Sequence, residues 1–346
     1  MCLNKKRFIP AVLFTLLIGF AVIISGVSFG SENIAVKDSV QIIFGKLFSW
    51  DLSQFKQSKI TILWNMRLPR MILALAVGGG LAIGGCAMQA LTQNILADPY
   101  ILGVSSGASV MVSTAFLLFG GKAALSYIAP LFAFFGALLA MVIVYIIGMR
   151  GKKVSTNNLV LTGMAVSVVL NAMSHLIITM LPNAFIMESA AMWMWGTLSA
   201  ARWHNILLPV IVSFLSMIVF SIAGGQFDLF SLGEETAVTL GIDTNRLKKI
   251  IIVFISILIG TIISASGLIG FIGFIIPHTT RMIFGSNNRR LFIMSFIVGG
   301  IFLACMDILS RTLLAPKEIA VGIFSAFFGG PFFIYLIIRK KRTGSI

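Results

Sequence analysis

The residues that could carry chemistry in this sequence are few and widely separated. The chain of 346 residues has only eleven acidic residues, three histidines and three cysteines. The cysteines have neither the spacing of a metal site nor that of a disulfide framework. Glu234 and Glu235 are adjacent carboxylates, but no histidine or metal-ligand cluster accompanies them, as general acid–base catalysis would require. His175 lies alone in an apolar run, where a packing role is favoured over a proton relay. The sequence therefore disfavours a catalytic centre.

Charged residues gather instead at the ends of apolar runs. Arg67 and Arg70, in the sequence RLPR, open the second long run. Burying two arginines in lipid would be too costly, so we expect them in the headgroup zone or in a protein contact. Asp307 and Arg311 lie one helical turn apart near the end of another run. This spacing favours an ion pair within one helix.

Small polar residues interrupt the apolar pattern in two places. Residues 94–108 (NILADPYILGVSSGA) contain Asp98-Pro99, which breaks a helix. Such backbone is tolerated at membrane depth only where protein buries it or where it lines a cavity. Ser155 and Thr156 follow a basic loop, and their small hydroxyls suit both a helix N-cap and a narrow, neutral constriction. Gln89 ends a glycine-rich run whose glycines favour close helix packing, and its polar side chain would suit the wall of a path.

The longest polar inner loop covers residues 232–249 (LGEETAVTLGIDTNRLKK). Glu234 and Glu235 begin a short helix there, because acidic groups are favourable at a helix N-terminus. Ala237 and Leu240 are three residues apart and are expected to share one face of that helix. A short amphipathic helix in the cytosol is an element that a peripheral partner protein can grip.

Helices in a membrane must position all of these residues. Apolar residues make up 58% of the chain and charged residues 11%, against about 25% in a soluble domain. The mean hydropathy is +1.02, and a soluble globule of this size could not hide so much apolar surface. The sequence therefore predicts an all-α polytopic membrane protein with about ten transmembrane helices.

The predicted helices form a single transmembrane domain over residues 1–346. The first helix covers about 8–29, and a more polar outer segment follows at 31–61. Within that segment, residues 40–48 are amphipathic and would lie along the membrane interface. The core helices lie between 66 and 338, and a cytoplasmic coupling segment covers 228–249. The core runs are near 66–90, 100–119, 125–148, 158–181, 203–223, 249–266, 268–284, 291–310 and 319–338.

The distribution of basic residues sets the orientation. The chain has 26 Lys and Arg against 11 Asp and Glu, a net charge of +15. With ten crossings and an inside N-terminus, most of the basic residues cluster at the inner ends of helices, as the positive-inside rule requires. Both termini are therefore expected in the cytoplasm.

Three classes of function fit a polytopic helical protein. The sequence has no Gly-x-x-x-x-Gly-Lys-Ser/Thr motif, so ATP-driven transport would need an ATPase on a separate chain. The alternative, an ion-coupled secondary transporter, would want several carboxylates at mid-membrane, whereas the acidic residues are nearly all at helix ends or in loops. An intramembrane enzyme would need a nucleophile–base or metal constellation, and the sequence shows none.

Six motifs, taken in order, resemble one known family. They are RLPR, the glycine-rich helix ending in Gln, N-x-LADP-x-x-LG-x-x-x-GA, LGE-x-x-A-x-x-LG-x-D, GLIGFIGFIIPH-x-x-R, and D-x-x-x-R ahead of GIF-x-A-x-x-GGPFF. From about residue 67 to 333 the chain resembles the FecCD-type permeases, the membrane subunits of ATP-binding cassette (ABC) importers for iron-siderophores, haem and cobalamin. Ile95 departs from the family's usual proline, and Lys317 sits just before Glu318.

The resemblance implies a fold like that of the cobalamin importer permease and import of an iron chelate, haem or cobalamin across the cell (inner) membrane. The implied partners are cytosolic ATP-binding cassette subunits, an extracytoplasmic substrate-binding protein and a second permease copy, as a homodimer or close heterodimer. Neither nucleic acid, a cofactor nor a metal site is implied, and the permease itself is not an enzyme. The sequence does not specify the cargo.

The resemblance also assigns roles to individual residues. Arg67, Arg70 and Arg311 match arginines that meet acidic residues of the binding protein. Ser155 and Thr156 match a pair at the cytoplasmic gate, with Asn94 and Leu96 in a neighbouring gate loop. The segment that docks into the ATPase is matched by Leu232, Gly233, Glu234, Glu235, Ala237, Leu240 and Gly241.

Overall fold

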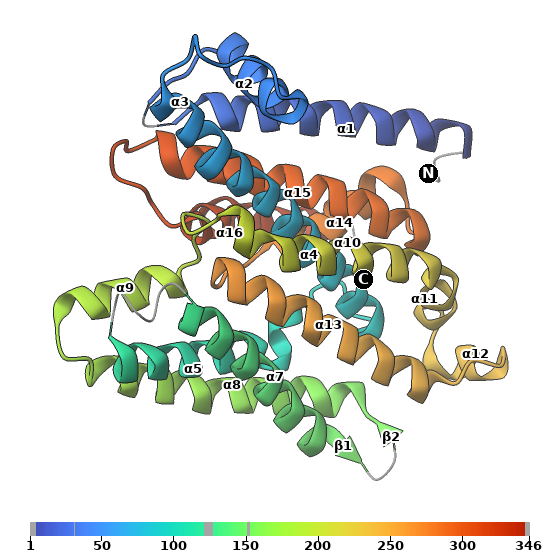
Figure 1. The fold of residues 1–346 in the computed structure, drawn as a ribbon. Helices are drawn as coiled ribbons and strands as arrows, with labels where there is room; N and C mark the ends of the chain where they lie inside the picture. Colours follow the sequence, from blue (N-terminus) through green and yellow to red (C-terminus); the bar gives the residue numbers. More distant parts are fainter. Residues whose placement is uncertain (1–4, 31, 121–126, 151–152, 343–346) are drawn as a thin grey trace.

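The computed structural model describes residues 5–30, 32–120, 127–150 and 153–342, and nearly all of them lie in helices. The axes of most of the long helices are roughly aligned (Figure 1). Within these ranges the strands are β1 (Met149–Arg150) and β2 (Lys153–Val154), which form a two-residue antiparallel pair. The predicted all-α class is therefore confirmed. Residue 31 of the predicted outer segment and residues 125–126 of the predicted run 125–148 lie outside the described residues.

Each of the ten predicted apolar runs is helical, with ends that differ by a few residues from those expected. In chain order these helices are α1 (Lys5–Ser28), α4 (Leu68–Thr92), α5 (Val104–Phe119), α7 (Ala129–Gly148), α8 (Thr156–Thr179), α10 (Trp203–Ile222), α13 (Thr244–Ser266), α14 (Ile272–Phe284), α15 (Asn288–Thr312) and α16 (Val321–Arg342). In the described residues, seven helical segments are long and apolar enough to cross a membrane, and shorter apolar stretches lie at 104–119, 184–194 and 321–335.

Shorter helices lie at the two ends of the molecule, apart from a 3₁₀ turn inside the bundle. They are α2 (Val36–Phe48), α3 (Gln57–Thr61), the π-helical turn η1 (Ile62–Arg67), the 3₁₀ turn η2 (Pro99–Leu102), α9 (Ala184–Met194), α11 (Gly224–Ser231) and α12 (Glu234–Thr239). In Figure 1, α2, α3 and α9 lie at one end, which we call the α9 end. The start of α1, α11, α12 and the β1–β2 pair lie at the opposite end, the α12 end. The amphipathic stretch expected at 40–48 falls within α2.

Helix α4 lies at the centre of the bundle. It ends the apolar span 57–92, and 89% of the most apolar 18-residue stretch of that span is buried. Its glycines are the reason why neighbouring backbones can approach it closely. A side chain at Gly78 would collide with the backbone of Gly299 in α15, and one at Gly85 would collide with Gly273 in α14. The predicted role of these glycines in close helix packing is confirmed.

The break at Asp98-Pro99 is covered by protein. The Asp98 carboxylate caps η2 by accepting from the backbone N–H of Tyr100 at 2.8 Å. The Tyr100 hydroxyl in turn donates to the carbonyl of Ile269 at 3.1 Å, in the non-helical stretch between α13 and α14. Two interruptions from distant parts of the chain therefore satisfy each other's polar groups, as irregular backbone at membrane depth requires.

Candidate functional site

Three arginines from distant parts of the chain meet at the α9 end. Arg67 ends η1, Arg70 lies in the first turn of α4 and Arg311 lies in the last turn of α15. They share a cavity of about 430 Å³, which we call the arginine cavity. Its lining residues are Gly30, Glu32, Ile62, Met66, Arg67, Arg70, Ser199, Arg202, Arg311 and Glu318.

Arg70 forms ion pairs with two carboxylates. Its Nε lies 2.8 Å from Oδ1 of Asp307, and its Nη1 lies 2.9 Å from Oε2 of Glu318. The Asp307 side chain is completely buried, whereas that of Glu318 is 44% exposed. Arg70 is thus balanced on one side by a carboxylate inside the protein and on the other by one at the cavity wall.

Asp307 also pairs with Arg311. Oδ2 of Asp307 lies 3.1 Å from Nε of Arg311, so the ion pair expected from their spacing is confirmed. Nη2 of Arg311 donates to the carbonyl of Gly26 in α1 at 2.8 Å. One buried carboxylate therefore joins α4 and α15, and Arg311 extends the connection to α1.

Arg67 is held by backbone carbonyls. Its Nη1 donates to the carbonyls of Val27 and Ser28 at 2.9 and 3.0 Å, and its Nη2 donates to the carbonyl of Glu32. These carbonyls lie at and just beyond the C-terminus of α1, where a positive charge is favourable. The guanidinium thus ties the start of the α4 segment to the end of α1.

All three predicted arginines are buried, with 5–7% of each residue exposed. Of the two positions expected for Arg67 and Arg70, the protein contact is therefore the one found. The sequence reasoning did not include Arg202, which lines the same cavity and donates through Nη1 to the carbonyls of Ser199 and Ala201 at 3.2 and 2.7 Å. It also gave no cavity role to Glu318. Neither residue lies in a pattern that would bring it to the other arginines.

At the α12 end, the predicted coupling segment 228–249 covers the second half of α11, all of α12 and the first turns of α13. Glu234 begins α12, and its Oε2 lies 2.7 Å from Nζ of Lys248 in α13, a side chain that is almost completely buried. The hydroxyl of Thr244 donates to Oε1 of Glu234 at 3.3 Å. Glu235 is exposed. The short helix that begins at Glu234 and Glu235 is therefore confirmed, and Glu234 attaches it to the bundle.

Ala237 and Leu240 do not share a face. Ala237 is completely buried, while Leu240 is 56% exposed. The reason is that α12 ends at Thr239, so Leu240 lies beyond its last turn and Gly241 follows with a positive φ of 87°. The exposed apolar residues of this segment are Leu232, Val238 and Leu240.

A second attachment, which the sequence reasoning missed, joins α11 to α15. Oδ1 of Asp228 accepts from the backbone N–H and the side-chain amide of Asn288, both at 2.8 Å, and Oδ2 accepts from Asn287 at 3.2 Å. The only sequence signal is a pair of asparagines ahead of a helix, which by itself indicates an N-cap. Asn287 is indeed the N-cap of α15.

The predicted gate residues lie at the ends of their helices. Ser155 is the N-cap of α8 and its Oγ accepts from the N–H of Asn158 at 3.5 Å, so the N-cap reading is confirmed. In the loop after α4, Oδ1 of Asn94 accepts from the N–H of Leu96 at 2.9 Å, and Leu96 is exposed. Gln89 is buried rather than lining a path, because it accepts from Nη1 of Arg281 at 3.2 Å and donates to the carbonyl of Phe274 at 3.4 Å.

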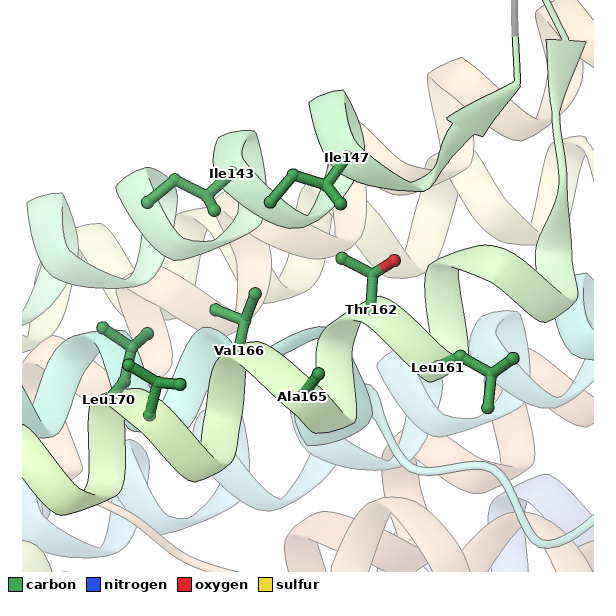
Figure 2. A pocket seen from close by; sticks show the side chains of 8 residues that line it. Ile143, Ile147, Leu161, Thr162, Ala165, Val166 and Leu170 are labelled. Atoms are coloured by element: carbon green, nitrogen blue, oxygen red, sulfur yellow. The ribbon is translucent and has the colours of Figure 1, made fainter.

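Helix α8 is the least buried of the long core helices. Only 11% of its apolar 18-residue stretch is buried within the chain. It forms one wall of an apolar groove of about 550 Å³, the other wall being α7. Figure 2 shows Ile143 and Ile147 of α7 facing Thr162 and Val166 of α8 across this groove. His175, expected to be packed, is exposed on the same helix, as is Asn171.

In the described part of the chain, no three His, Cys, Asp or Glu side chains come close enough to hold a metal ion. The site is instead a pair of polar regions, one at each end of the bundle.

The chain is similar in sequence to known transport proteins. The model of the FecCD transport family matches residues 12–339. The Fe(3+)-citrate import system permease protein YfmD of Bacillus subtilis is 33% identical, over 98% of both chains. The hemin transport system permease protein HmuU of Yersinia pestis is 34% identical, over 81% of this chain and 84% of its own.

A solved structure described as an inward-facing conformation of a metal-chelate type ABC transporter has the same fold. Its TM-score is 0.82 at 23% identity, and the match covers 95% of this chain and 99% of that one. The family model and the full-length relatives establish that the chain belongs to the FecCD transport family, a family of membrane transport permeases.

Proposed function

We propose that this permease is the transmembrane subunit of a binding-protein-dependent ABC importer that moves an iron chelate, haem or cobalamin into the cytoplasm. One observation carries the proposal: an exposed short helix with acidic residues lies at one end of the bundle, and a cavity of arginines lies at the other. The sequence has no nucleotide-binding motif, so a partner must supply the ATP hydrolysis. Relatives named for iron-citrate and hemin support the class of cargo.

The α12 end is the cytoplasmic end in this proposal. Basic residues near the ends of α13, α14 and α15 support this orientation, because positive charge is retained on the cytoplasmic side. These residues are Arg246, Lys249, Arg281, Arg289 and Arg290. The N- and C-termini are then cytoplasmic, and the arginine cavity opens outward.

Residues 232–241 dock into the separate ATPase. The exposed side chains of Leu232, Val238 and Leu240 give an apolar contact, and Glu235 gives a charge beside it. Glu235→Lys reverses that charge without touching the Glu234–Lys248 pair. We expect it to lower both iron-chelate uptake and the amount of ATPase that copurifies, while membrane insertion is unchanged.

The matched control is Glu188→Lys, the same reversal on an exposed residue of α9 at the opposite end. Normal uptake and copurification in the Glu235→Lys variant, or equal losses in both variants, would contradict the docking assignment. The double variant with Glu234→Lys also disrupts the attachment of α12 and should lose more.

A second copy of the chain packs near α8, and Ser155 and Thr156 form a cytoplasmic gate with Asn94 and Leu96. The open face of α8 supports this, since exposed Asn171 and His175 would be costly against lipid. In a chain whose own cysteines have been replaced, Ser155→Cys and Thr156→Cys should each crosslink between two copies, with a yield that depends on bound nucleotide. Thr179→Cys, at the far end of α8, is the positional control. The absence of a crosslink at 155 and 156 in every nucleotide state would leave Ser155 only as an N-cap.

The arginine cavity docks acidic residues of the extracytoplasmic binding protein. Arg202 offers the clearest test, because within the described residues its side chain donates to backbone carbonyls and forms no ion pair. Arg202→Glu should slow binding of the partner protein, and the difference from the unchanged chain should fade as salt rises. Lys56→Glu, a reversal of an exposed charge at the same end away from the cavity, is the control. Equal affinity and equal salt dependence of the Arg202→Glu variant and the unchanged chain would refute the assignment.

A further inference from the structure

The two carboxylates on Arg70 differ in how firmly they are held. Asp307 is part of α15, is completely buried and is shared with Arg311. Glu318 is in the loop between α15 and α16, and its side chain is 44% exposed. One carboxylate is therefore fixed by the fold, and water reaches the other.

The loop that carries Glu318 is held in place without that side chain. The N–H of Ile319 donates to the carbonyl of Ser310 at 3.1 Å, and the N–H of Lys317 donates to the carbonyl of Leu314 at 3.0 Å. Ala320, two residues after Glu318, is buried. The Glu318 side chain can therefore leave Arg70 by a rotamer change, while the loop backbone stays where it is.

The charges of the cavity favour a replacement carboxylate once Glu318 leaves. Asp307 supplies one negative charge to Arg70 and Arg311, so those three groups alone carry a net positive charge. Arg67 and Arg202 add two more positive charges, and the Glu32 carboxylate, which lines the same cavity, offsets one of them. A buried cation without a counter-charge is costly. The cavity of about 430 Å³ has room for a carboxylate side chain from outside.

We propose that Glu318 is an internal substitute for the partner's carboxylate, so that docking at the arginine cavity exchanges one carboxylate on Arg70 for another. This rests on the proposed docking function of the cavity. In the free permease Glu318 is the second carboxylate that pairs with Arg70. On docking, an acidic side chain of the partner takes that place and Glu318 turns to water. The exchange lowers affinity, because the partner must displace an ion pair that already exists.

The test measures binding of the extracytoplasmic protein that copurifies with the unchanged chain, after its separate purification, to the permease–ATPase complex in lipid nanodiscs. Glu318→Gln removes the competing charge and should tighten binding about fivefold, the upper range for an ion pair exposed to water. Glu318→Asp keeps the charge but shortens the reach to Arg70, so it should tighten binding by a smaller factor.

Glu32→Gln is the matched control, because Glu32 lines the same cavity but meets Arg67 through its backbone carbonyl. It removes the same charge without removing a competitor, so its effect should be smaller than that of Glu318→Gln. Thermal unfolding of each variant shows whether the fold is retained.

Each outcome decides between the two proposals. If Arg202→Glu and Arg67→Lys bind as the unchanged chain does, the docking function itself is wrong. If they lose affinity while Glu318→Gln has no effect, weakens binding, or acts no more strongly than Glu32→Gln, docking stands and the exchange is refuted. Loss of affinity at Arg202 and Arg67 together with tighter binding of Glu318→Gln than of Glu32→Gln supports both.

Discussion

The arginine cavity and the α12 segment both carry ion pairs, but they place their charges differently. At the cavity, Asp307, Arg70 and Arg311 are all within the protein and connect α4 and α15, with α1 joined through Arg311. At the α12 segment, Lys248 is buried, but its partner Glu234 is 49% exposed and Glu235 faces solvent. Buried charges are costly unless each is paired with an opposite charge, so the ion pairs of the arginine cavity serve mainly to hold the helices together. The exposed charges of α12 remain available to a partner.

Helix α15 connects the two regions. Its first residue, Asn288, is bound to Asp228 of α11, and Asp307 and Arg311 lie in its last two turns. At 25 residues it is about 37 Å long. Substitutions of graded severity at the α9 end and at the α12 end can therefore test the contrast between the two regions.

The largest effect is expected from Asp307→Ala. It leaves Arg70 and Arg311 without their shared carboxylate inside the protein, a loss of about 3–5 kcal/mol in the free energy of unfolding. Thermal unfolding in detergent, together with the amount of folded protein in membranes, would measure it. If the unfolding temperature falls as little as it does on loss of an exposed ion pair, the cavity charges are hydrated and do not differ in burial from those of the α12 end.

A smaller effect is expected from Ala237→Leu. Ala237 is the completely buried residue of α12, so the larger side chain should cost about 1–3 kcal/mol or push α12 off the bundle. Hydrogen exchange of the α12 amides should rise, while that of α4 stays unchanged. Val238→Leu, at an exposed neighbour, is the control and should leave exchange unaltered. Equal exchange in both variants would contradict the attachment of α12 through Ala237.

Asp228→Ala should act locally. It removes three hydrogen bonds between α11 and the start of α15, at a partly exposed site, and we expect a cost of about 1–2 kcal/mol. The measurement is hydrogen exchange in α11 and at the first turn of α15, with the residues near Arg311 as an internal reference. Faster exchange throughout α15 would mean that the two ends are not independent.

The smallest effect is expected from Asp38→Ala at the α9 end. Asp38 and Lys59 are 3.5 Å apart and both are about one-third exposed, so their pair contributes at most about 1 kcal/mol. Thermal unfolding should be nearly unchanged, and any change should vanish at high salt. A loss close to that of Asp307→Ala would show that position at this end, rather than burial, sets the energetic importance of an ion pair.

Much of the fold could be read from the sequence because a membrane demands long apolar helices and a glycine-rich run favours close packing. The ten runs, the short helix at Glu234, the break at Asp98-Pro99 and the Asp307–Arg311 pair all depend on contacts within a few residues. The prediction that Ala237 and Leu240 share one helix face was wrong because it assumed that α12 continues through Leu240, whereas α12 ends at Thr239. The prediction that Gln89 lines a path was wrong because Gln89 is buried and accepts a hydrogen bond from Arg281, which is far away in the sequence.

Apolar content alone does not distinguish α4 from α8, since both are long enough and apolar enough to span a membrane. Yet 89% of the apolar 18-residue stretch in the span 57–92, which ends with α4, is buried, against 11% of the corresponding stretch in α8. The sequence by itself determined the class of protein, the helices and the presence of arginines at helix ends, because local periodicity and composition carry that information. Only the tertiary structure decided that Arg70 faces both Asp307 and Glu318, that Arg202 joins the same cavity, and that Asp228 binds Asn288. These contacts join residues far apart in the chain, and their distances follow from how whole helices pack.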